Sequence, residues 1–167
     1  MSETESRGDR KQGGPRSADR RARSSAARIY AVQALFQMEA ADQSADRVAR
    51  EFQDWRIGVD YEEGTTPDAD EGLFARILDS AVNWQARIDQ MIDRALVAKW
   101  PIARLDPVLR ATFRAAGAEL VADATPPKVV ISEYVAVADA FFPEGTEARF
   151  VNAVLDHIAR EARPEAF

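Results

Sequence analysis

Residues 27–36 read Ala-Arg-Ile-Tyr-Ala-Val-Gln-Ala-Leu-Phe, and the spacing of their apolar side chains indicates an α-helix. One stripe of this helix consists of Ala27, Ala31, Ala34, Leu35 and Met38. A second stripe lies beside it and consists of Ile29, Gln33 and Phe36. Ser24 and Ser25 precede the pattern, and serine is a preferred N-cap residue, so we expect the helix to begin there.

Outward from this segment, the helical spacing continues to the end of the chain, and no stretch has a convincing period of two. The longest pattern opens at Asp68 or Asp70 and runs to about Lys99, because Pro101 disfavours helical geometry at Trp100. Such a helix of about 29 residues would be roughly 43 Å long. An acidic loop, residues 57–67, separates it from a short helix that Ser44 can cap and that places Val48, Phe52 and Trp55 on one face.

Three more helices are predicted downstream. Asp106-Pro107 is a strong start signal, because aspartate accepts from free amides and proline at the first helical position loses no hydrogen bond. Residues 127–142 are apolar over most of a helix circumference, which indicates a central helix. Pro143 ends it, and Thr146 can cap the last helix. The sequence therefore predicts an all-α bundle of about seven helices in two parts of three to four helices, residues 24–99 and 100–162.

The N-terminal region has the opposite charge from the rest of the chain. Residues 1–28 contain eight Arg and Lys side chains against four carboxylates, although the whole chain of 167 residues carries a net charge of −6. Residues 1–23 hold almost no large apolar side chain, so we expect a flexible Arg-rich arm. A basic arm on an acidic body is typical of a segment that contacts phosphate, although such tails also serve solubility alone.

The sequence offers little for catalysis. There is no cysteine and a single histidine, His157, which we expect at the surface or its boundary. Asp89 and Asp93 share a helical face, but we interpret them as solvated charges, since the histidines of a di-metal site are missing. No Gly-rich phosphate loop is present. We therefore expect no enzyme, no cofactor and no metal, and the lack of an apolar leader or membrane-spanning run favours a cytoplasmic protein.

Several segments together resemble the NusB family of bacterial transcription antitermination factors. Residues 27–36 resemble the family's first helix, and the other matching segments are Asn83-Trp84 with Arg87-Ile88-Asp89, Arg104-Leu105-Asp106, Phe113-Arg114, Glu119-Leu120, residues 127–133 and residues 150–156. The match covers about residues 20–160 in the family's order. The chain departs from the family pattern at Phe36, Leu109, Ala118, Ser132, Ala153 and the longer loop 142–146.

The resemblance implies a function in recognition rather than catalysis. NusB pairs with NusE, a protein of the small ribosomal subunit, and the pair binds the single-stranded boxA element of nascent RNA. The assembly joins other Nus factors on RNA polymerase and suppresses termination, notably in ribosomal RNA operons. Some family members self-associate, so a homodimer is left open here.

For RNA we assign Arg20, Arg21, Arg23, Arg28, Arg149, Phe150 and Asn152. Arginine neutralises phosphate and stacks on unpaired bases, and a helix beginning at Ser24 would add free amides that attract phosphate. The family uses the phenylalanine at position 150 at its RNA surface, and core packing is the competing interpretation. Arg28 has an alternative as an ordinary surface residue, and Asn152 as a residue that holds neighbouring backbone.

For the protein partner we assign Ile29, Gln33, Phe36, Arg110 and Arg114. Phe36 stands where family members contact NusE. Arg114 has an alternative as the partner of a carboxylate such as Glu119 or Glu133 inside the bundle, and we interpret Glu133 as structural. Two rival functions are a protein-only helical adaptor and a free-standing relative of the NusB-like domain of RNA cytosine methyltransferases.

Overall fold

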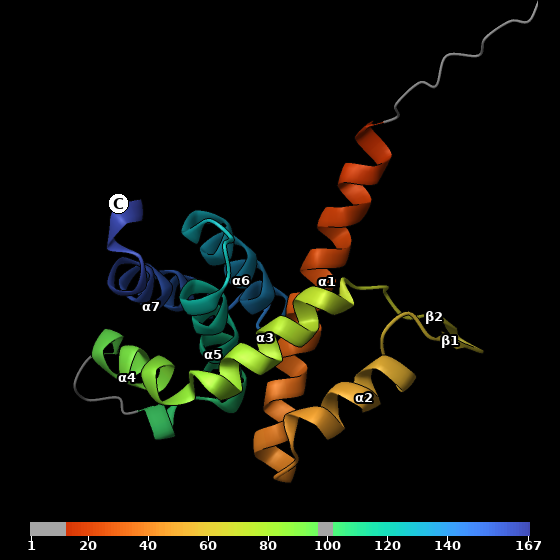
Figure 1. Ribbon diagram of the computed structural model, residues 1–167, viewed down its shortest axis with the longest axis horizontal. Helices are drawn as coiled ribbons and strands as arrows, with labels where there is room; N and C mark the ends of the chain where they lie inside the picture. Colours follow the sequence, from red (N-terminus) through yellow and green to blue (C-terminus); the bar gives the residue numbers. More distant parts are fainter. Residues whose placement is uncertain (1–12, 97–101) are drawn as a thin grey trace, which may run out of the picture.

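The computed structural model describes residues 13–96 and 102–167, and it is all-α, as predicted (Figure 1). Its seven α-helices within this range are α1 (Gly13–Ala41), α2 (Ala45–Trp55), α3 (Glu71–Asn83), α4 (Gln85–Ala95), α5 (Pro107–Ala122), α6 (Pro127–Phe141) and α7 (Glu147–Ala162). Short 3-10 turns follow α4 and α7 at Ile102–Arg104 and Pro164–Ala166.

Side-chain caps fix where three of these helices begin. Ser44 accepts from the amide of Arg47 at 3.3 Å, and Asp70 accepts from the amide of Leu73 at 3.0 Å. Asp106 accepts from the amide of Val108 at 2.8 Å, with Pro107 at the first helical position. The predicted starts of α2 and α5 are thus confirmed, and Asp70 rather than Asp68 caps α3, because each cap satisfies an amide that the helix leaves free.

The first helix begins earlier than predicted. A start at Ser24 or Ser25 is wrong, because α1 already runs from Gly13. Residues 16–23 are mostly Arg and Ala, which favour helix, and extending a formed helix costs little. The amides near Ser24 therefore lie inside the helix, and the attraction for phosphate that a helix end at Ser24 would supply is absent. Residues 1–12 of the predicted arm lie outside the described residues.

The predicted long helix is broken into α3 and α4 at Trp84, whose amide donates to the carbonyl of Ser80 at 2.9 Å. The bend directs α4 onto α5 and α7, so that Ile88 of α4 packs against Gly117 of α5. The prediction of a single helix over residues 70–99 is therefore wrong, because tertiary packing decided the direction of its second half. Helix α4 ends at Ala95, before the predicted end near Lys99, and residues 97–101 lie outside the described residues.

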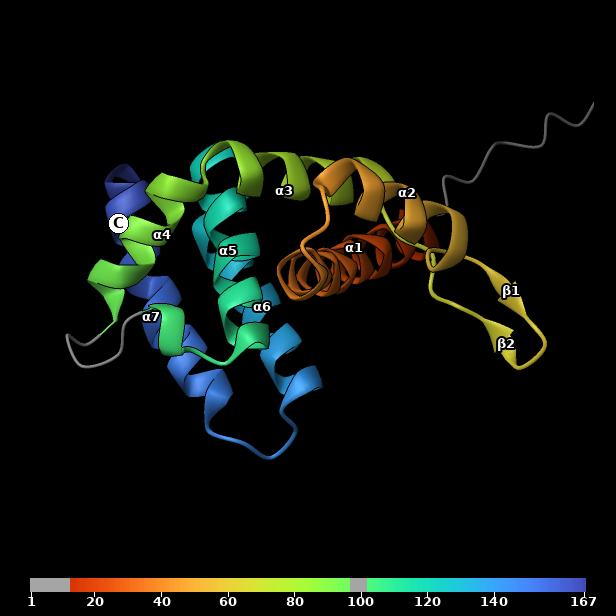
Figure 2. The ribbon, with the colours of Figure 1, turned by 90° about the horizontal axis from the view of Figure 1, so that it is seen from below.

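The core is built around α5, which contacts α1, α3, α4, α6 and α7 (Figure 2). Ten residues of α5 between Leu109 and Leu120 are buried. The central place predicted for residues 127–142 is wrong, since α6 covers one side of α5 and leaves Val129 43% exposed. Small residues such as Ala115, Ala116 and Gly117 allow α5 to be surrounded, because they let neighbouring helices approach closely.

A small hairpin occupies part of the predicted acidic loop. Strands β1 (Asp60–Tyr61) and β2 (Gly64–Thr65) pair antiparallel, with Gly64 at a φ of +139° that favours glycine. The hydroxyl of Tyr30 in α1 donates to the carbonyls of Pro67 at 2.8 Å and Arg56 at 3.1 Å, which fastens the base of the hairpin to the bundle. Of the three side chains that the spacing places on one face of α2, Val48 and Phe52 are buried, whereas Trp55 at the last turn is 65% exposed.

Candidate nucleic-acid and protein interfaces

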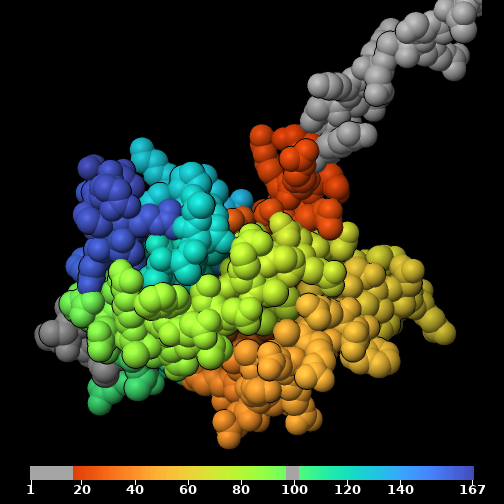
Figure 3. Space-filling model, viewed as in Figure 1, coloured from red at the N-terminus to blue at the C-terminus, as the bar shows by residue number. Residues whose placement is uncertain are grey.

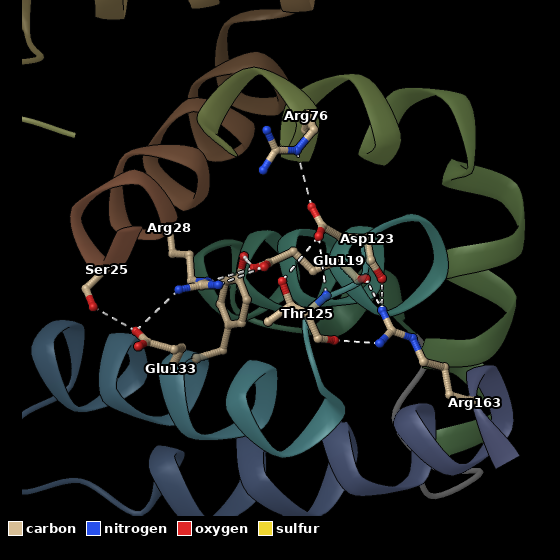
Figure 4. A network of polar contacts seen from close by, with 9 residues as sticks. Ser25, Arg28, Arg76, Glu119, Asp123, Thr125, Glu133 and Arg163 are labelled. Carbon is tan, nitrogen blue, oxygen red and sulfur yellow. Dashed lines mark hydrogen bonds and ion pairs between the residues drawn. The ribbon is translucent and has the colours of Figure 1, made fainter. Parts of the chain in front are cut away.

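A buried polar network joins α1, α5 and α6 (Figure 4). The guanidinium of Arg28 donates two hydrogen bonds of 2.9 Å to the carboxylate of Glu119, and both side chains are almost fully buried. Tyr134 donates to the same carboxylate at 2.6 Å, and Ser25 donates to Glu133 at 2.9 Å. Because each buried charge is paired and hydrogen-bonded, the network fixes how α1 lies against α5 and α6.

The electrostatics of this network keep Arg28 charged. Burial lowers the pKa of the Arg28 guanidinium, but the hydrogen bonds and charge of Glu119 outweigh this, so the pKa lies above its ordinary value. Burial, reinforced by the charge of Glu119, raises the pKa of Tyr134 well above its usual range. Arg28 is therefore an internal residue rather than a phosphate ligand, which corrects its assignment to RNA, whereas Glu133 is structural, as predicted.

The other predicted arginines of α1 are accessible. Arg20 and Arg21 are exposed on the turns of α1 that project from the bundle (Figure 3). Arg23 is 43% exposed, and its Nε lies 3.4 Å from a carboxylate oxygen of Asp68. The helix gives these side chains a defined direction that a flexible arm would not give them.

The predicted residues of α7 lie on its first two turns. Arg149 and Asn152 are exposed. Phe150 is partly exposed and partly packed: it is 38% exposed, and its ring packs edge-on against Phe113 with 5.8 Å between ring centroids. A stacking face is thus held on the core, which lowers the entropy cost of presenting it.

Helix α6 lies between these two groups and contacts both α1 and α7 (Figure 4). Asn152 lines a hollow of about 400 Å³ together with Lys128, Ile131, Ser132 and Val135 of α6. Lys128 is exposed at the first turn of α6 and was missed as a candidate. Two features of the sequence could have indicated it. Lys128 follows Pro127, with which the helix begins, and it lies in the segment 127–133 that resembles the family.

The predicted partner residues divide between a groove and an ion-pair cluster. Gln33 and Phe36 line a groove of about 460 Å³ between α1, α2, α5 and α6, and Phe36 is 38% exposed. We call this the Phe36 groove; its full lining is Val32, Gln33, Phe36, Gln37, Ala40, Ala41, Arg56, Val108 and Phe141. Ile29 is half-buried against the core and is not part of its lining.

Arg110 and Arg114 of α5 form the ion-pair cluster with two carboxylates. Arg110 donates to Glu39 at 2.9 Å, and Arg114 donates to Glu39 at 3.0 Å and to Asp89 at 2.9 and 3.0 Å. The hydrogen bond from Arg110 holds the pKa of Glu39 below its ordinary value. Arg114 does pair with carboxylates, as its alternative interpretation had it, but these are Glu39 and Asp89 rather than Glu119 or Glu133. The interpretation of Asp89 as a solvated charge is wrong, because α4 bends toward this face of α5.

His157 and the acidic side chains were predicted to take no part in catalysis or metal binding. His157 is exposed on α7, as predicted. Within the described residues, no group of three or more His, Cys, Asp or Glu side chains is arranged to hold a metal ion. No helix in that part of the chain is both long and apolar enough to span a membrane.

The described residues form an all-helical body with a projecting cationic stretch of α1, a partly exposed aromatic ring on α7 and a separate apolar groove, which is the build of a helical adaptor with several surfaces. The family model described as NusB family matches residues 25–160. A protein of Granulibacter bethesdensis named transcription antitermination protein NusB is 47% identical over 85% of this chain and 90% of its own length. The protein of the same name from Caulobacter vibrioides is 46% identical over 83% and 93%. The chain belongs to the NusB family.

Solved structures agree with this assignment. The NusB structure of T. maritima superposes with a TM-score of 0.69 at 29% identity, covering 86% of this chain and 95% of that one. A chain from a structure of NusB and NusE in complex with double-stranded RNA has a TM-score of 0.66 at 22% identity, over 82% and 96%. At 22% identity, the likeness to the chain from the NusB–NusE–RNA structure shows a shared fold.

Proposed function

We propose that this protein is a transcription antitermination factor that binds boxA RNA jointly with the ribosomal protein NusE. The observation that carries the proposal is the placement of two separate surfaces on one NusB-family bundle. One surface is cationic and aromatic, on α1, α6 and α7, and the other is the Phe36 groove. The chain would act by recognition, without catalysis, on transcription in the bacterial cytoplasm, where other Nus factors and RNA polymerase complete the assembly.

On the RNA surface, Arg20, Arg21, Lys128 and Arg149 supply exposed cations for phosphate. Phe150 offers a ring on which an unpaired base can stack, an interaction worth about 1–3 kcal/mol. Asn152 adds an amide that can hydrogen-bond to a base edge. Arg23 contributes less, since Asp68 lies close to its guanidinium.

On the protein surface, the Phe36 groove offers a concave apolar site with Gln33 and Arg56 as polar residues at its edge. Arg110 and Arg114 are already paired with Glu39 and Asp89, so we propose that they position α5 beside the groove rather than bind the partner alone. The solved complex of NusB with NusE and RNA supports a protein partner of this kind. The names of the relatives favour this function over a protein-only adaptor or a methyltransferase remnant.

The decisive test is a titration of labelled boxA RNA with the protein, with and without NusE, over a range of salt concentrations. We expect NusE to increase the affinity and added salt to decrease it. Phe150→Leu keeps an apolar contact with Phe113 but removes the stacking face, so it should weaken RNA binding about tenfold at unchanged melting temperature. The matched control is Phe167→Leu, at an exposed ring near the C-terminus.

Two results would contradict the proposal. A protein that binds neither RNA nor NusE at low salt has neither function. A protein that binds NusE with no effect on RNA affinity is a protein-only adaptor. Light scattering on the same samples gives the oligomeric state and so decides whether the free protein self-associates before NusE is added.

A further inference from the structure

A second hollow adjoins the Phe36 groove, and its most accessible side chains are aromatic. It has a volume of about 510 Å³ and lies over α1, the end of α2 and the hairpin. Trp55 is 65% exposed and Tyr61 51% exposed, although large aromatic side chains usually bury most of their surface. We call this the aromatic hollow; its lining is Tyr30, Gln33, Glu51, Trp55, Arg56, Tyr61 and Thr66.

The aromatic hollow is continuous with the Phe36 groove, because Gln33 and Arg56 line both. The segment that carries the two rings forms one edge of the molecule, drawn in gold to yellow in Figure 3. A partner seated in the groove can therefore extend over the rings without crossing the bundle.

The backbone that carries the rings is anchored. The Tyr61 hydroxyl donates to the carbonyl of Trp55, which links the hairpin to the end of α2. The Tyr30 hydroxyl holds the carbonyls of Arg56 and Pro67, and Thr66 pairs with Val59 at the base of the hairpin. Because the rings lie on a fastened scaffold, a partner would not need to order this segment on binding.

The charge around the rings decides what they can bind. Residues 51–68 carry six carboxylates, Glu51, Asp54, Asp60, Glu62, Glu63 and Asp68, against one cation, Arg56. Glu51 is paired with Arg56 and Asp68 with Arg23, and the other four carboxylates leave this segment acidic. An acidic rim repels the phosphates of RNA and attracts a cationic protein. Exposed tryptophan faces also attract arginine and lysine side chains through cation–π contact.

We propose that the aromatic hollow is a second part of the partner-binding surface and receives a cationic segment of the protein that occupies the Phe36 groove. The inference rests on the proposed function, since it takes the partner to be NusE, a protein that binds RNA within the ribosome. Trp55 and Tyr61 hold the apolar or cationic side chains of that segment, and the acidic hairpin speeds its approach.

The test is calorimetric titration of NusE into the full-length wild-type protein and the Trp55→Ala, Tyr61→Ala and Phe36→Ala variants. We expect Trp55→Ala to weaken NusE binding about tenfold or more, as a central aromatic contact does, with a smaller loss for Tyr61→Ala. The matched control is Trp84→Ala, at a ring that is 45% exposed on the opposite end of α3 and should change NusE affinity less than about twofold. Circular dichroism confirms that each variant keeps its helices.

A second variant tests the charge. Glu62→Gln with Glu63→Gln should slow NusE association and flatten its dependence on salt, because rim charges act mainly on the association rate. If Trp55→Ala binds NusE like wild type while Phe36→Ala is weakened, the aromatic hollow is not part of the interface and the proposed function stands. If Trp55→Ala instead weakens boxA RNA binding without NusE, the hollow is an RNA site and the inference is overturned. If wild type does not bind NusE at all, the proposed function and this inference both fail.

Discussion

Gly117 of α5 faces Ile88 of α4 so closely that a Cβ atom on residue 117 would lie 2.6 Å from the Cγ2 atom of Ile88. Both residues are buried, and Cγ2 is fixed to a branched carbon rather than to the end of a flexible chain. The contact explains why α4 can lie directly on α5. It also explains why the chain bends at Trp84, since a straight α3–α4 helix would not bring Ile88 to this position.

Gly117→Ala is therefore expected to destabilise the protein although alanine favours helix. Alanine gains about 1 kcal/mol in helix propensity, but overpacking at a buried site costs about 1–3 kcal/mol, so we expect a net loss of up to about 2 kcal/mol. Urea denaturation measures it. In an Ile88→Ala background the same change should cost nothing or stabilise; an equal loss in both backgrounds would show that Ile88 is not the obstacle.

Arg28→Met should lower the free energy of unfolding by about 3–5 kcal/mol, because it leaves the buried carboxylate of Glu119 without its cation. Thermal and urea denaturation measure the loss. Arg21→Met, on the exposed part of α1, should leave stability unchanged and weaken RNA binding instead. An Arg28→Met protein that is fully stable but defective in RNA binding would restore Arg28 to the RNA surface.

Arg163→Ala should destabilise the C-terminal end of α5, although Arg163 itself lies at the end of α7. The Arg163 guanidinium donates to the carbonyls of Leu120 at 2.8 Å and Glu119 at 2.7 Å and also to those of Asp123 and Thr125, at and just beyond the last turn of α5, where few helical amides remain as partners (Figure 4). We expect a loss of about 2 kcal/mol and faster amide exchange at residues 119–125. Arg160→Ala, at an exposed pair with Asp156, is the control and should change stability by less than about 0.5 kcal/mol. Equal effects of the two changes would contradict the assignment.

Glu39→Gln should make stability less dependent on pH in the acid range. The pKa of Glu39 is lowered in the folded protein, so its contribution is complete above the ordinary glutamate pKa of 4.5 and is lost as the pH falls through the lowered value. The wild type should thus exceed Glu39→Gln by about 0.5 kcal/mol at pH 7, and the difference should shrink as the pH falls below 4.5. Denaturation from pH 7 to 3 measures it, with Asp54→Asn on α2 as control. A difference that grows at acid pH would reverse the assigned sign.

The sequence alone determined the helical class, the starts of α2 and α5, and the family, because these depend on neighbours within a few residues. Apolar spacing follows one helix turn, and a cap such as Asp106 acts on an amide two residues away. The exposed candidates Arg20, Arg149 and Asn152 could also be chosen this way, since local pattern leaves them off the core stripes.

Only the tertiary structure decided the bend at Trp84, the central place of α5 and the burial of Arg28. Arg28 and Glu119 are 91 residues apart, so no local pattern reveals that they neutralise each other inside the bundle. The same holds for Arg114 with Asp89 and for the shape of the Phe36 groove, which four helices form together. Close packing of distant segments fixes these features, because a charge is stable in the interior only where the fold brings its partner to it.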